Sequence, residues 1–416
     1  MAWISQESLI RPYEEGRDFP AVERMWQEVG WMDDAAKQAP HLREILDSGR
    51  CLTATVGDEA ECLAHVVPGS IWLGSSPLPM CAVAAVMTSR IGRRRGLAKR
   101  LTAQQLAYGA GQGAAVAALG MFDQGFYDEL GFGSGSYQHR FDFDPATLTV
   151  DVPLRTPSRL TLEHWREMHA AMANRLKNHG ACVLDSPEFL KADLAWNGKG
   201  FGLGYFDGDA LSHFLWLTYS DDPEHGPYRV LFWAYRSREE LLELMALLKS
   251  LSDQVSSISM QEPAHLQLQD LLEQPIRNLR QTQNSPFANL HRSLAIWQIR
   301  ALDIPVCVSA LVMRGPEVKF NLQLTDPVAD YLEPDGWRGV AGDYVVCIGG
   351  SSSAEPGNDA RLPTLNATVG AFTRMLFGFV SASNLSASDD LSGPGELLDA
   401  LDGAIALPRA VWGWDF

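Results

Sequence analysis

The feature of this sequence that most constrains its fold is an apolar strand that leads through a basic turn into a helix. Residues 83–101 read VAAVMTSRIGRRRGLAKRL, and residues 81–120 contain six basic side chains and no acidic one. The whole chain, in contrast, has a formal net charge of −17. A helix N-terminus presents free N–H groups and the positive end of the helix dipole, so this turn predicts a binding site for a phosphate or pyrophosphate group.

A glycine distinguishes this turn from an ordinary solvated charged turn. From the charges alone, an anion-binding turn and a solvated charged turn are equally favoured. Gly96 follows Arg93 by three residues and precedes the small Ala98 by two, and a glycine lets the backbone approach a ligand closely. The motifs G-x-G-x-x-G, G-x-x-x-x-G-K-[ST] and G-x-S-x-G do not occur in the chain. The turn therefore favours an anionic cofactor over plain solvation.

The alternation of short apolar strands with amphipathic helices predicts an α/β architecture in more than one unit. At about 150 residues per domain, the length of the chain predicts two or three domains. The first unit should contain an antiparallel meander of strands at 51–56, 61–67, 70–73 and 80–86. A linker near Pro145 leads to a second unit of the same order, in which a hairpin of 211–218 and 228–234 precedes a helix that begins after Ser237.

From about Ser293 the pattern changes to a third, α+β unit. Its predicted elements are strands at 305–312 and 319–324, a hairpin at 339–348, a Gly/Ser-rich loop at 349–359 and a helix at 366–379. The second unit lacks a basic turn, because Glu239 and Glu240 stand at the start of its helix and would repel an anionic cofactor. We expect that unit to be a scaffold that shapes an acceptor pocket.

Composition argues against several classes of protein. The acidic balance of charges disfavours binding to nucleic acid or to an anionic membrane surface. The six cysteines form no C-x-x-C pair, so neither a metal site nor a disulfide framework is predicted. The N-terminus has no signal-peptide pattern, and no stretch resembles a transmembrane helix. We therefore expect a cytoplasmic protein, compatible with small cationic ligands.

Two motifs together resemble a known superfamily. Arg93, Gly96 and Ala98 are similar to the Arg/Gln-x-x-Gly-x-Gly/Ala signature of the GNAT acetyltransferases, whose loop holds the pyrophosphate of acetyl-CoA. Residues 126–133, FYDELGFG, resemble the Tyr-x-x-x-Gly-Phe/Tyr segment that follows the fifth strand of GNAT enzymes. The resemblance implies that Tyr127 protonates the departing CoA thiolate, whereas a lone tyrosine before such a turn is more often a packing residue.

The whole chain resembles the enhanced-intracellular-survival (Eis-type) acetyltransferases. That family has tandem GNAT-like domains, each a mixed sheet flanked by helices, and then a sterol-carrier-protein-like α+β domain. The resemblance implies domains at 1–147, 148–290 and 291–416, a homohexamer, acetyl-CoA as co-substrate and no metal. It carries the acetyl-CoA contacts over to Val86, Met87, Thr88, Arg93, Arg94, Arg95, Gly96, Leu97, Ala98, Lys99, Phe122 and Asp123. The last two depart from the small and acidic pair expected there.

The function implied by this resemblance is transfer of acetyl from acetyl-CoA to a primary amine of a small cationic acceptor, which is aminoglycoside-, polyamine- or lysine-like. In the family the terminal carboxylate lies in the active site, and here that is the carboxylate of Phe416. An aromatic C-terminus buried only for packing is an equal alternative. The rival function is a non-catalytic protein that binds lipid or hydrophobic ligands through its C-terminal domain, and the intact Arg93, Gly96 and Tyr127 weigh against it.

Overall fold

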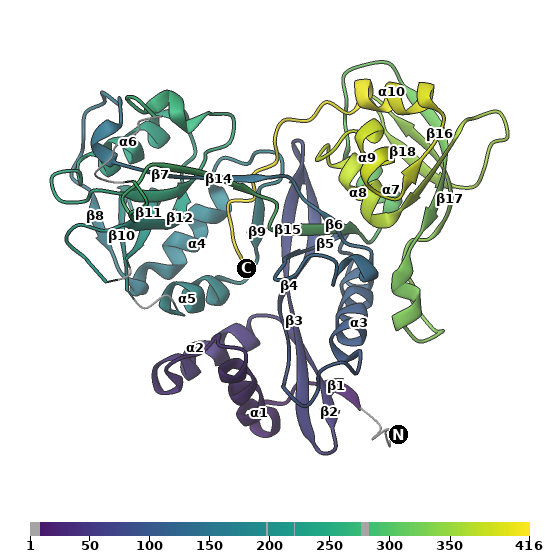
Figure 1. Ribbon diagram of the computed structural model, residues 1–416, viewed down its shortest axis with the longest axis horizontal. Helices are drawn as coiled ribbons and strands as arrows, with labels where there is room; N and C mark the ends of the chain where they lie inside the picture. Colours follow the sequence, from purple (N-terminus) through teal and green to yellow (C-terminus); the bar gives the residue numbers. More distant parts are fainter. Residues whose placement is uncertain (1–8, 197–198, 220, 276–282) are drawn as a thin grey trace.

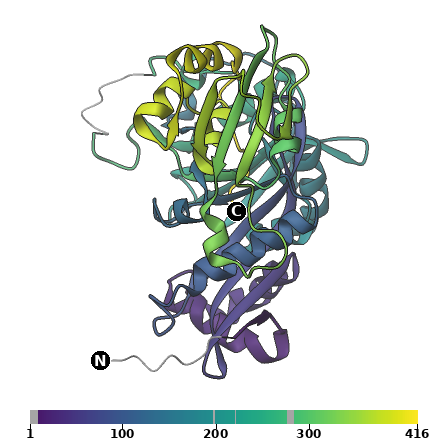
Figure 2. The same cartoon turned by 90° about the vertical axis from the view of Figure 1, so that its right-hand side faces the viewer.

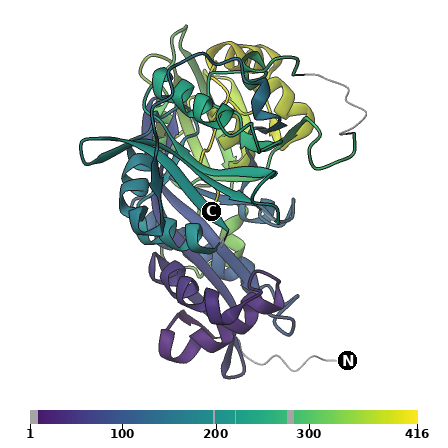
Figure 3. The ribbon, with the colours of Figure 1, turned by 90° about the vertical axis from the view of Figure 1, so that its left-hand side faces the viewer.

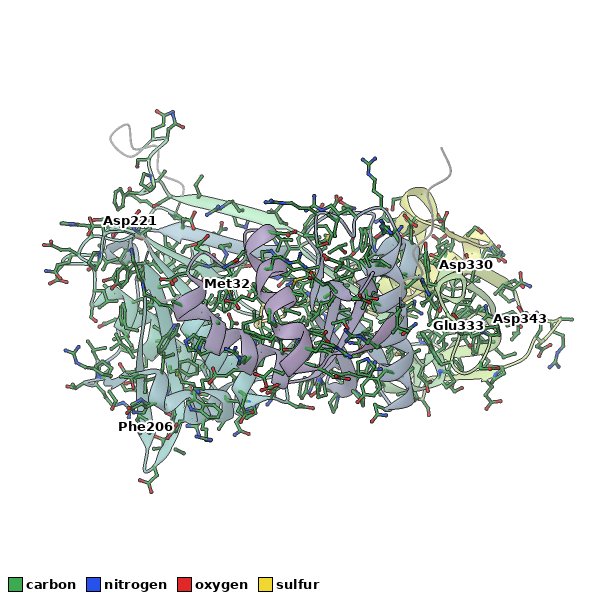
Figure 4. All side chains as sticks on the ribbon, turned by 90° about the horizontal axis from the view of Figure 1, so that it is seen from below. Met32, Phe206, Asp221, Asp330, Glu333 and Asp343 are labelled. Atoms are coloured by element: carbon green, nitrogen blue, oxygen red, sulfur yellow. The ribbon has the colours of Figure 1, made fainter. Side chains whose placement is uncertain are left out.

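The computed structural model describes residues 9–196, 199–219, 221–275 and 283–416, and these form three β-sheets. Figure 1 shows the first sheet at the centre, the second unit on one side of it and the C-terminal unit on the other. The three units also lie in a row when seen from below (Figure 4). That view labels Met32 in the first unit, Phe206 and Asp221 in the second, and Asp330, Glu333 and Asp343 in the C-terminal unit.

The first sheet has the strand order β1-β2-β3-β4-β5-β15-β6, and β9 pairs with β3. Its strands are β1 (Ile10–Pro12), β2 (Arg50–Val56), β3 (Glu59–Leu73), β4 (Ser76–Thr88), β5 (Val116–Gly120), β6 (Gly133–Ser134), β9 (Cys182–Leu184) and β15 (Trp297–Ala301). The strands predicted at 61–67 and 70–73 are one strand, because the residues between them stay paired with β4.

Helices cover both faces of the first sheet. On one face, α1 (Glu15–Glu28) and α2 (Ala35–Asp47) pack against alternate residues of β2, β3 and β4. On the other face, α3 (Leu97–Gly111) packs through Leu97 and Leu101 against the residues in between. This alternation follows from the two-residue period of side chains along a strand.

The second sheet has the order β14-β7-β13-β12-β11-β10-β8. Its strands are β7 (Gln138–Phe143), β8 (Ser158–Leu160), β10 (Gly200–Asp207), β11 (Ala210–Tyr219), β12 (Tyr228–Ala234), β13 (Ile258–Gln261) and β14 (Leu290–Leu294). The helix α6 (Arg238–Lys249) packs on one face and α4 (Trp165–Asn174) packs on the other, while α5 (Pro187–Trp196) lies beside α4 and α2. The predicted hairpin of β11 and β12 is confirmed, as is the helix that begins after Ser237.

The two α/β units share a local order and exchange strands. In the first unit β4 leads through α3 to the parallel strand β5, and in the second β12 leads through α6 to the parallel strand β13. However, β7 follows the first unit in sequence and pairs with β13, while β15 follows the second unit and pairs with β5. Because these strands cross between the sheets, the limits at residues 147 and 290 remain proposals.

The third sheet has the order β18-β17-β16-β19-β20 and belongs to the C-terminal unit. Its strands are β16 (Val318–Thr325), β17 (Gly342–Ile348), β18 (Ser353–Pro356), β19 (Thr364–Thr368) and β20 (Leu391–Ser392). The helices of this unit are α7 (Ile304–Ala310), α8 (Val369–Leu376), α9 (Ala382–Ser388) and α10 (Gly395–Ala404). Short 3-10 helices elsewhere are η1 (Asp128–Leu130), η2 (Pro145–Thr147), η3 (Leu162–His164), η4 (Leu268–Leu271) and η5 (Pro327–Tyr331).

Four predictions for the C-terminal unit were wrong. The first is the loop predicted at 349–359, which contains the strand β18 because residues 353–356 pair with β17. Residues 305–312 were predicted as a strand, but α7 forms there because the Asp303 carboxylate accepts the N–H of Val306 at 2.9 Å and Pro305 suits a first helical turn. The hairpin predicted at 339–348 is a single strand, β17, which pairs with both β16 and β18. The helix predicted from residue 366 begins at 369, after the last residue of β19 caps it.

The last residues of the chain, 405–416, return from the C-terminal unit to the space between the first two units (Figure 1). The amide of Cys182 donates to the carbonyl of Trp412 at 3.0 Å, and the amide of Val411 donates to the carbonyl of His179 at 3.0 Å. The indole of Trp412 stacks on Trp297 of β15 with the ring centroids 4.6 Å apart. Figure 3, turned by 90° from Figure 1, views the molecule from the side of the second unit and marks the C-terminus near the centre.

Candidate active site

The strands β4 and β5 diverge and leave an opening in the first sheet. They pair in parallel only where Met80–Ala82 faces Val116–Ala118. Beyond that point β4 continues to Thr88 beside β3, and β5 continues to Gly120 beside β15. A β-bulge places Ala84 opposite no residue of β3, because Val83 pairs with Val66 and Ala85 pairs with His65. The opening and the bulge leave backbone groups available to a ligand.

The basic turn follows β4 directly. Arg94 (φ 59°) and Gly96 (φ 70°) both adopt the left-handed conformation, which a glycine accepts without strain. The side chains of Arg93, Arg94 and Arg95 are exposed and form no ion pair within the described part of the chain. Helix α3 then begins without a side-chain cap and without an acidic residue in its first turn. Uncompensated positive charge at an uncapped helix start suits a phosphate group.

Lys99 is engaged by other residues of the protein. Its ammonium forms an ion pair with Glu129, whose carboxylate also accepts the hydroxyl of Tyr331 at 2.9 Å. Tyr331 belongs to η5 of the C-terminal unit, which lies beside α3 in Figure 2. The C-terminal unit therefore contacts the edge of the basic turn.

The other predicted cofactor residues are divided between the core and the surface. The side chain of Met87 is buried against α1 and α2, whereas Val86 lies on the opposite face, with Leu97 and Ala98. The hydroxyl of Thr88 lies 3.2 Å from the Cys62 thiol. The exposed residues Phe122 and Asp123 follow β5, and the Phe122 side chain is 67% exposed. Of the predicted cofactor residues, the three arginines of the turn, Phe122 and Asp123 are therefore exposed, whereas Met87 belongs to the core.

Tyr127 lies in an aromatic cluster at the end of β5 and is only 3% exposed. Its ring packs edge-on against Phe122, Phe126 and Phe132, with centroids 5.9, 4.9 and 5.9 Å away. Burial raises the pKa of Tyr127 above its usual value, so the hydroxyl stays protonated at neutral pH. Among the described residues, none forms a hydrogen bond with this hydroxyl. The Tyr127 hydroxyl is therefore a proton donor without an acceptor among the described residues.

Phe416 lies on the opposite face of β5 from Tyr127. Its ring packs edge-on against Trp297 at 4.8 Å. Its backbone oxygen would lie 3.3 Å from a Cβ atom added to Gly120, whereas Tyr127 belongs to the same buried cluster as Leu119, the preceding residue of the strand. Successive residues of a strand face opposite sides. The two predicted catalytic residues therefore lie on either side of the end of β5.

A cavity of about 360 Å³ adjoins the bulge and the C-terminus. Its lining residues are Trp26, Trp31, Ile45, Ala84, Ala85, Phe189, Asp193, Trp196, Asp415 and Phe416. Aromatic rings with carboxylates among them suit a cation, because the quadrupole of each ring gives its face a partial negative charge. Sequence reasoning identified only Phe416 of this set. The tryptophans and Phe189 lie on or near helices far apart in sequence, and their patterns resemble those of core residues.

In the described ranges, no cluster of three or more His, Cys, Asp or Glu side chains has the arrangement of a metal site. No helix in those ranges is long and apolar enough to cross a membrane.

Comparison with known proteins agrees with the geometry of the first unit. Residues 10–135 match the family model described as an acetyltransferase (GNAT) domain. The chain carries a GNAT acetyltransferase domain. This domain contains β4, the basic turn, α3 and β5, so both strands that border the opening belong to it. No curated protein is significantly similar to this chain in sequence.

Solved structures resemble the chain over its full length. A GCN5-related N-acetyltransferase from Anabaena variabilis has a TM-score of 0.78 at 14% identity, with 99% of this chain and 100% of that chain covered. A probable N-acyltransferase of unknown function from Enterococcus faecalis has a TM-score of 0.77 at 15% identity, with coverage of 99% and 100%. Eis1 from Mycobacterium abscessus has a TM-score of 0.74 at 17% identity, with coverage of 99% and 100%. These likenesses confirm the predicted fold class, tandem GNAT-like units followed by an α+β unit.

Proposed function

We propose that the protein is an Eis-type N-acetyltransferase that transfers acetyl from acetyl-CoA to a primary amine of a small cationic acceptor. The observation that carries this proposal is the cavity beside the β4 bulge, because its aromatic walls and carboxylates adjoin the opening of the GNAT domain. A cationic amine in that cavity would approach the opening from the face opposite α3.

Acetyl-CoA would bind on the α3 side of the opening. The backbone N–H groups at the start of α3, together with Arg94, Arg95 and the turn from Arg93 to Lys99, would hold its pyrophosphate. The edge of β4 at Val86, Met87 and Thr88 pairs with β3 but not with β5, and this open edge would face the pantetheine arm, with Phe122 and Asp123 bordering it. The second unit, with Glu239 and Glu240 in the first turn of α6, would take no cofactor.

In the reaction, the amine nitrogen attacks the thioester carbon, the C–N bond forms and the C–S bond breaks. The ammonium of the acceptor would first release one proton to solvent, so that the neutral nitrogen attacks. The protonated Tyr127 hydroxyl would supply the proton that the CoA thiolate takes up, and the second proton lost by the nitrogen would restore that hydroxyl. The terminal carboxylate of Phe416 would attract and orient the cationic acceptor, so that the amine and the thioester meet in reactive geometry. Asp193 and Asp415 would add to the negative potential of the cavity.

The rival function, a carrier of lipid or hydrophobic ligands, is not favoured by the packing of the described residues of the C-terminal unit. The interior of the C-terminal unit is filled by side chains with no exposed surface, among them Phe320, Leu365 and Phe372. We propose a sterol-carrier-protein-like domain at 291–416 with a structural role, a catalytic domain at 1–147 and a scaffold at 148–290. The homohexamer remains a prediction from the family resemblance, and the cytoplasmic location remains a prediction from the sequence.

The proposed function is tested by incubating the protein with acetyl-CoA and a panel of amines. The panel comprises an aminoglycoside, a polyamine and a lysine peptide, with a matched neutral alcohol as control. We expect thiol release only with amines, accompanied by a product heavier by one acetyl group. If no amine is acetylated and a fluorescent fatty acid instead binds the C-terminal unit, the rival function is correct.

A further inference from the structure

A second basic region lies far from the basic turn, between the second sheet and the C-terminal segment. It is a cavity of about 300 Å³ whose lining includes Arg140, Arg229, Arg292, Ser259, Gln261 and Asp415. Three guanidinium groups around one cavity are unexpected in a chain of net charge −17. The GNAT machinery described above uses none of these arginines.

The register of the sheet brings these side chains together on one face. Arg140 of β7 pairs directly with Arg292 of β14 on one side and with Gln261 of β13 on the other. Arg229 of β12 pairs with Ser259 of β13. The neighbouring residues on these strands point to the opposite face and pack under α6 in the core. Like charges directly opposite each other on adjacent strands destabilise a sheet.

The carboxylates nearby do not neutralise all three arginines. Arg292 pairs with Asp142 at 2.5 Å, and Arg229 lies 4.0 Å from Asp415. Arg140 forms no ion pair with any described residue, and its buried Nη1 atom has no hydrogen-bond acceptor. Burial, and then the charge of Arg229, lowers the pKa of Arg140 below its usual value, and the carboxylates of Asp415 and Asp142 offset only part of that shift. The protein therefore keeps a half-buried charge that lacks a partner, and such a group is costly to retain.

We propose that this cavity is a binding site for a compact oxyanion, a carboxylate or phosphate group, which Arg140 binds together with Arg229 and Arg292. A planar guanidinium can donate two parallel hydrogen bonds to either group. The oxyanion would supply the acceptor that Nη1 lacks and would relieve the repulsion between Arg140 and Arg292. The hydroxyl of Ser259 and the amide of Gln261 add donors at the wall of the cavity.

The site is connected to the acceptor cavity through the C-terminal segment. Asp415 lines both cavities and is the residue before Phe416. An oxyanion that binds Arg229 competes with the Asp415 carboxylate, so occupancy of one cavity changes the surroundings of the other. Anion binding at this site can be measured without acetyl transfer, so it is tested independently of the proposed function.

The test is calorimetric titration of the full chain with inorganic phosphate and, separately, with acetate. The protein carries Arg94→Glu and Arg95→Glu, so that the turn before α3 does not contribute to the signal. We expect saturable binding of at least one anion, with one site per chain, and weaker binding at higher salt. Arg140→Gln should weaken that binding about tenfold or more, because it removes charge-assisted hydrogen bonds. Binding of inorganic phosphate would identify a phosphate as the ligand group, and binding of acetate would identify a carboxylate.

The matched control is Arg159→Gln, which removes an exposed arginine of β8 in the same sheet and should leave binding unchanged. If Arg140→Gln fails to fold, as judged by its thermal melting curve, Arg229→Gln is used, since Arg229 is half exposed. The proposal is overturned if neither anion binds saturably, or if the variant in the cavity binds as tightly as the Arg159→Gln control.

Discussion

At the scale of single residues, Tyr127 combines tight packing with an unused hydroxyl. Its ring contacts three phenylalanines, and its hydroxyl forms no hydrogen bond with a described residue. Removing the oxygen should therefore leave the folded state almost unchanged, because no hydrogen bond to a described residue is lost and the ring contacts remain. This separation of packing from chemistry makes the residue a direct test of the proposed proton transfer.

We predict that Tyr127→Phe lowers kcat by about 10²–10⁴-fold, the usual contribution of a general acid, with little change in KM. The reason is that the hydroxyl acts as the thiolate forms, after both substrates have bound. Steady-state kinetics with an amine found in the panel would measure the effect, and thermal melting would verify the fold. Unchanged turnover would mean that Tyr127 only packs in the core.

His65 is a second residue whose burial has a measurable consequence. Neither of its ring nitrogens has a hydrogen-bond partner, and burial lowers its pKa from 6.5 to about 3. The unfolded chain therefore takes up a proton near pH 6.5, whereas the folded chain does not until about pH 3. The stability that the neutral imidazole contributes to the free energy of unfolding is fully present above pH 6.5. It is lost as the pH falls from 6.5 to about 3, because only the unfolded chain binds a proton at His65 in that range.

When the pH falls from 7 to 5, we predict that the free energy of unfolding decreases by about 2 kcal/mol less for His65→Leu than for the wild type. Urea unfolding at the two pH values measures the difference. His225→Gln, which removes an exposed imidazole, should behave like the wild type. Equal losses in all three proteins would show that His65 is protonated in the folded state or reaches water.

At the scale of elements, the basic turn was the part of the site most predictable from sequence. A sign reversal of local charge and a glycine before a helix are local signals, and the structure places them after β4 and before α3. The strand predicted at 305–312 shows the limit of such reasoning. Its β-branched residues favoured a strand, but the cap from Asp303 and the proline in the first turn determined a helix.

We predict that Arg94→Glu or Arg95→Glu weakens binding of CoA by about tenfold or more while the fold stays intact. Both side chains are exposed, so the change acts on the ligand and not on the core. Calorimetry should also find one CoA per chain and a difference that shrinks at high salt. Arg314→Glu, at an exposed arginine of the C-terminal unit, is the matched control. Two CoA molecules per chain would contradict the assignment of the second unit as a scaffold.

At the scale of the whole molecule, the site depends on contacts that no local pattern reveals. β15 completes the first sheet from a position more than 170 residues after β5 in sequence, and the Asp128 carboxylate accepts the amide of Gln298 on that strand at 2.6 Å. The aromatic cavity likewise combines α1, α5 and the C-terminus. Sequence periodicity indicates that a residue is apolar, but it does not say whether that residue lines a core or a cavity.

The C-terminal segment joins these distant parts, because it runs between the first two units and ends beside Gly120. Its carboxylate exists only if Phe416 is the last residue. The most direct measurement is therefore the rate of acetyl transfer by proteins extended by a few residues at either end. We predict that the C-terminal extension abolishes transfer but leaves CoA binding intact, and that the N-terminal extension has no effect. Transfer at the wild-type rate by a C-terminally extended protein, verified intact by its mass, would contradict the account.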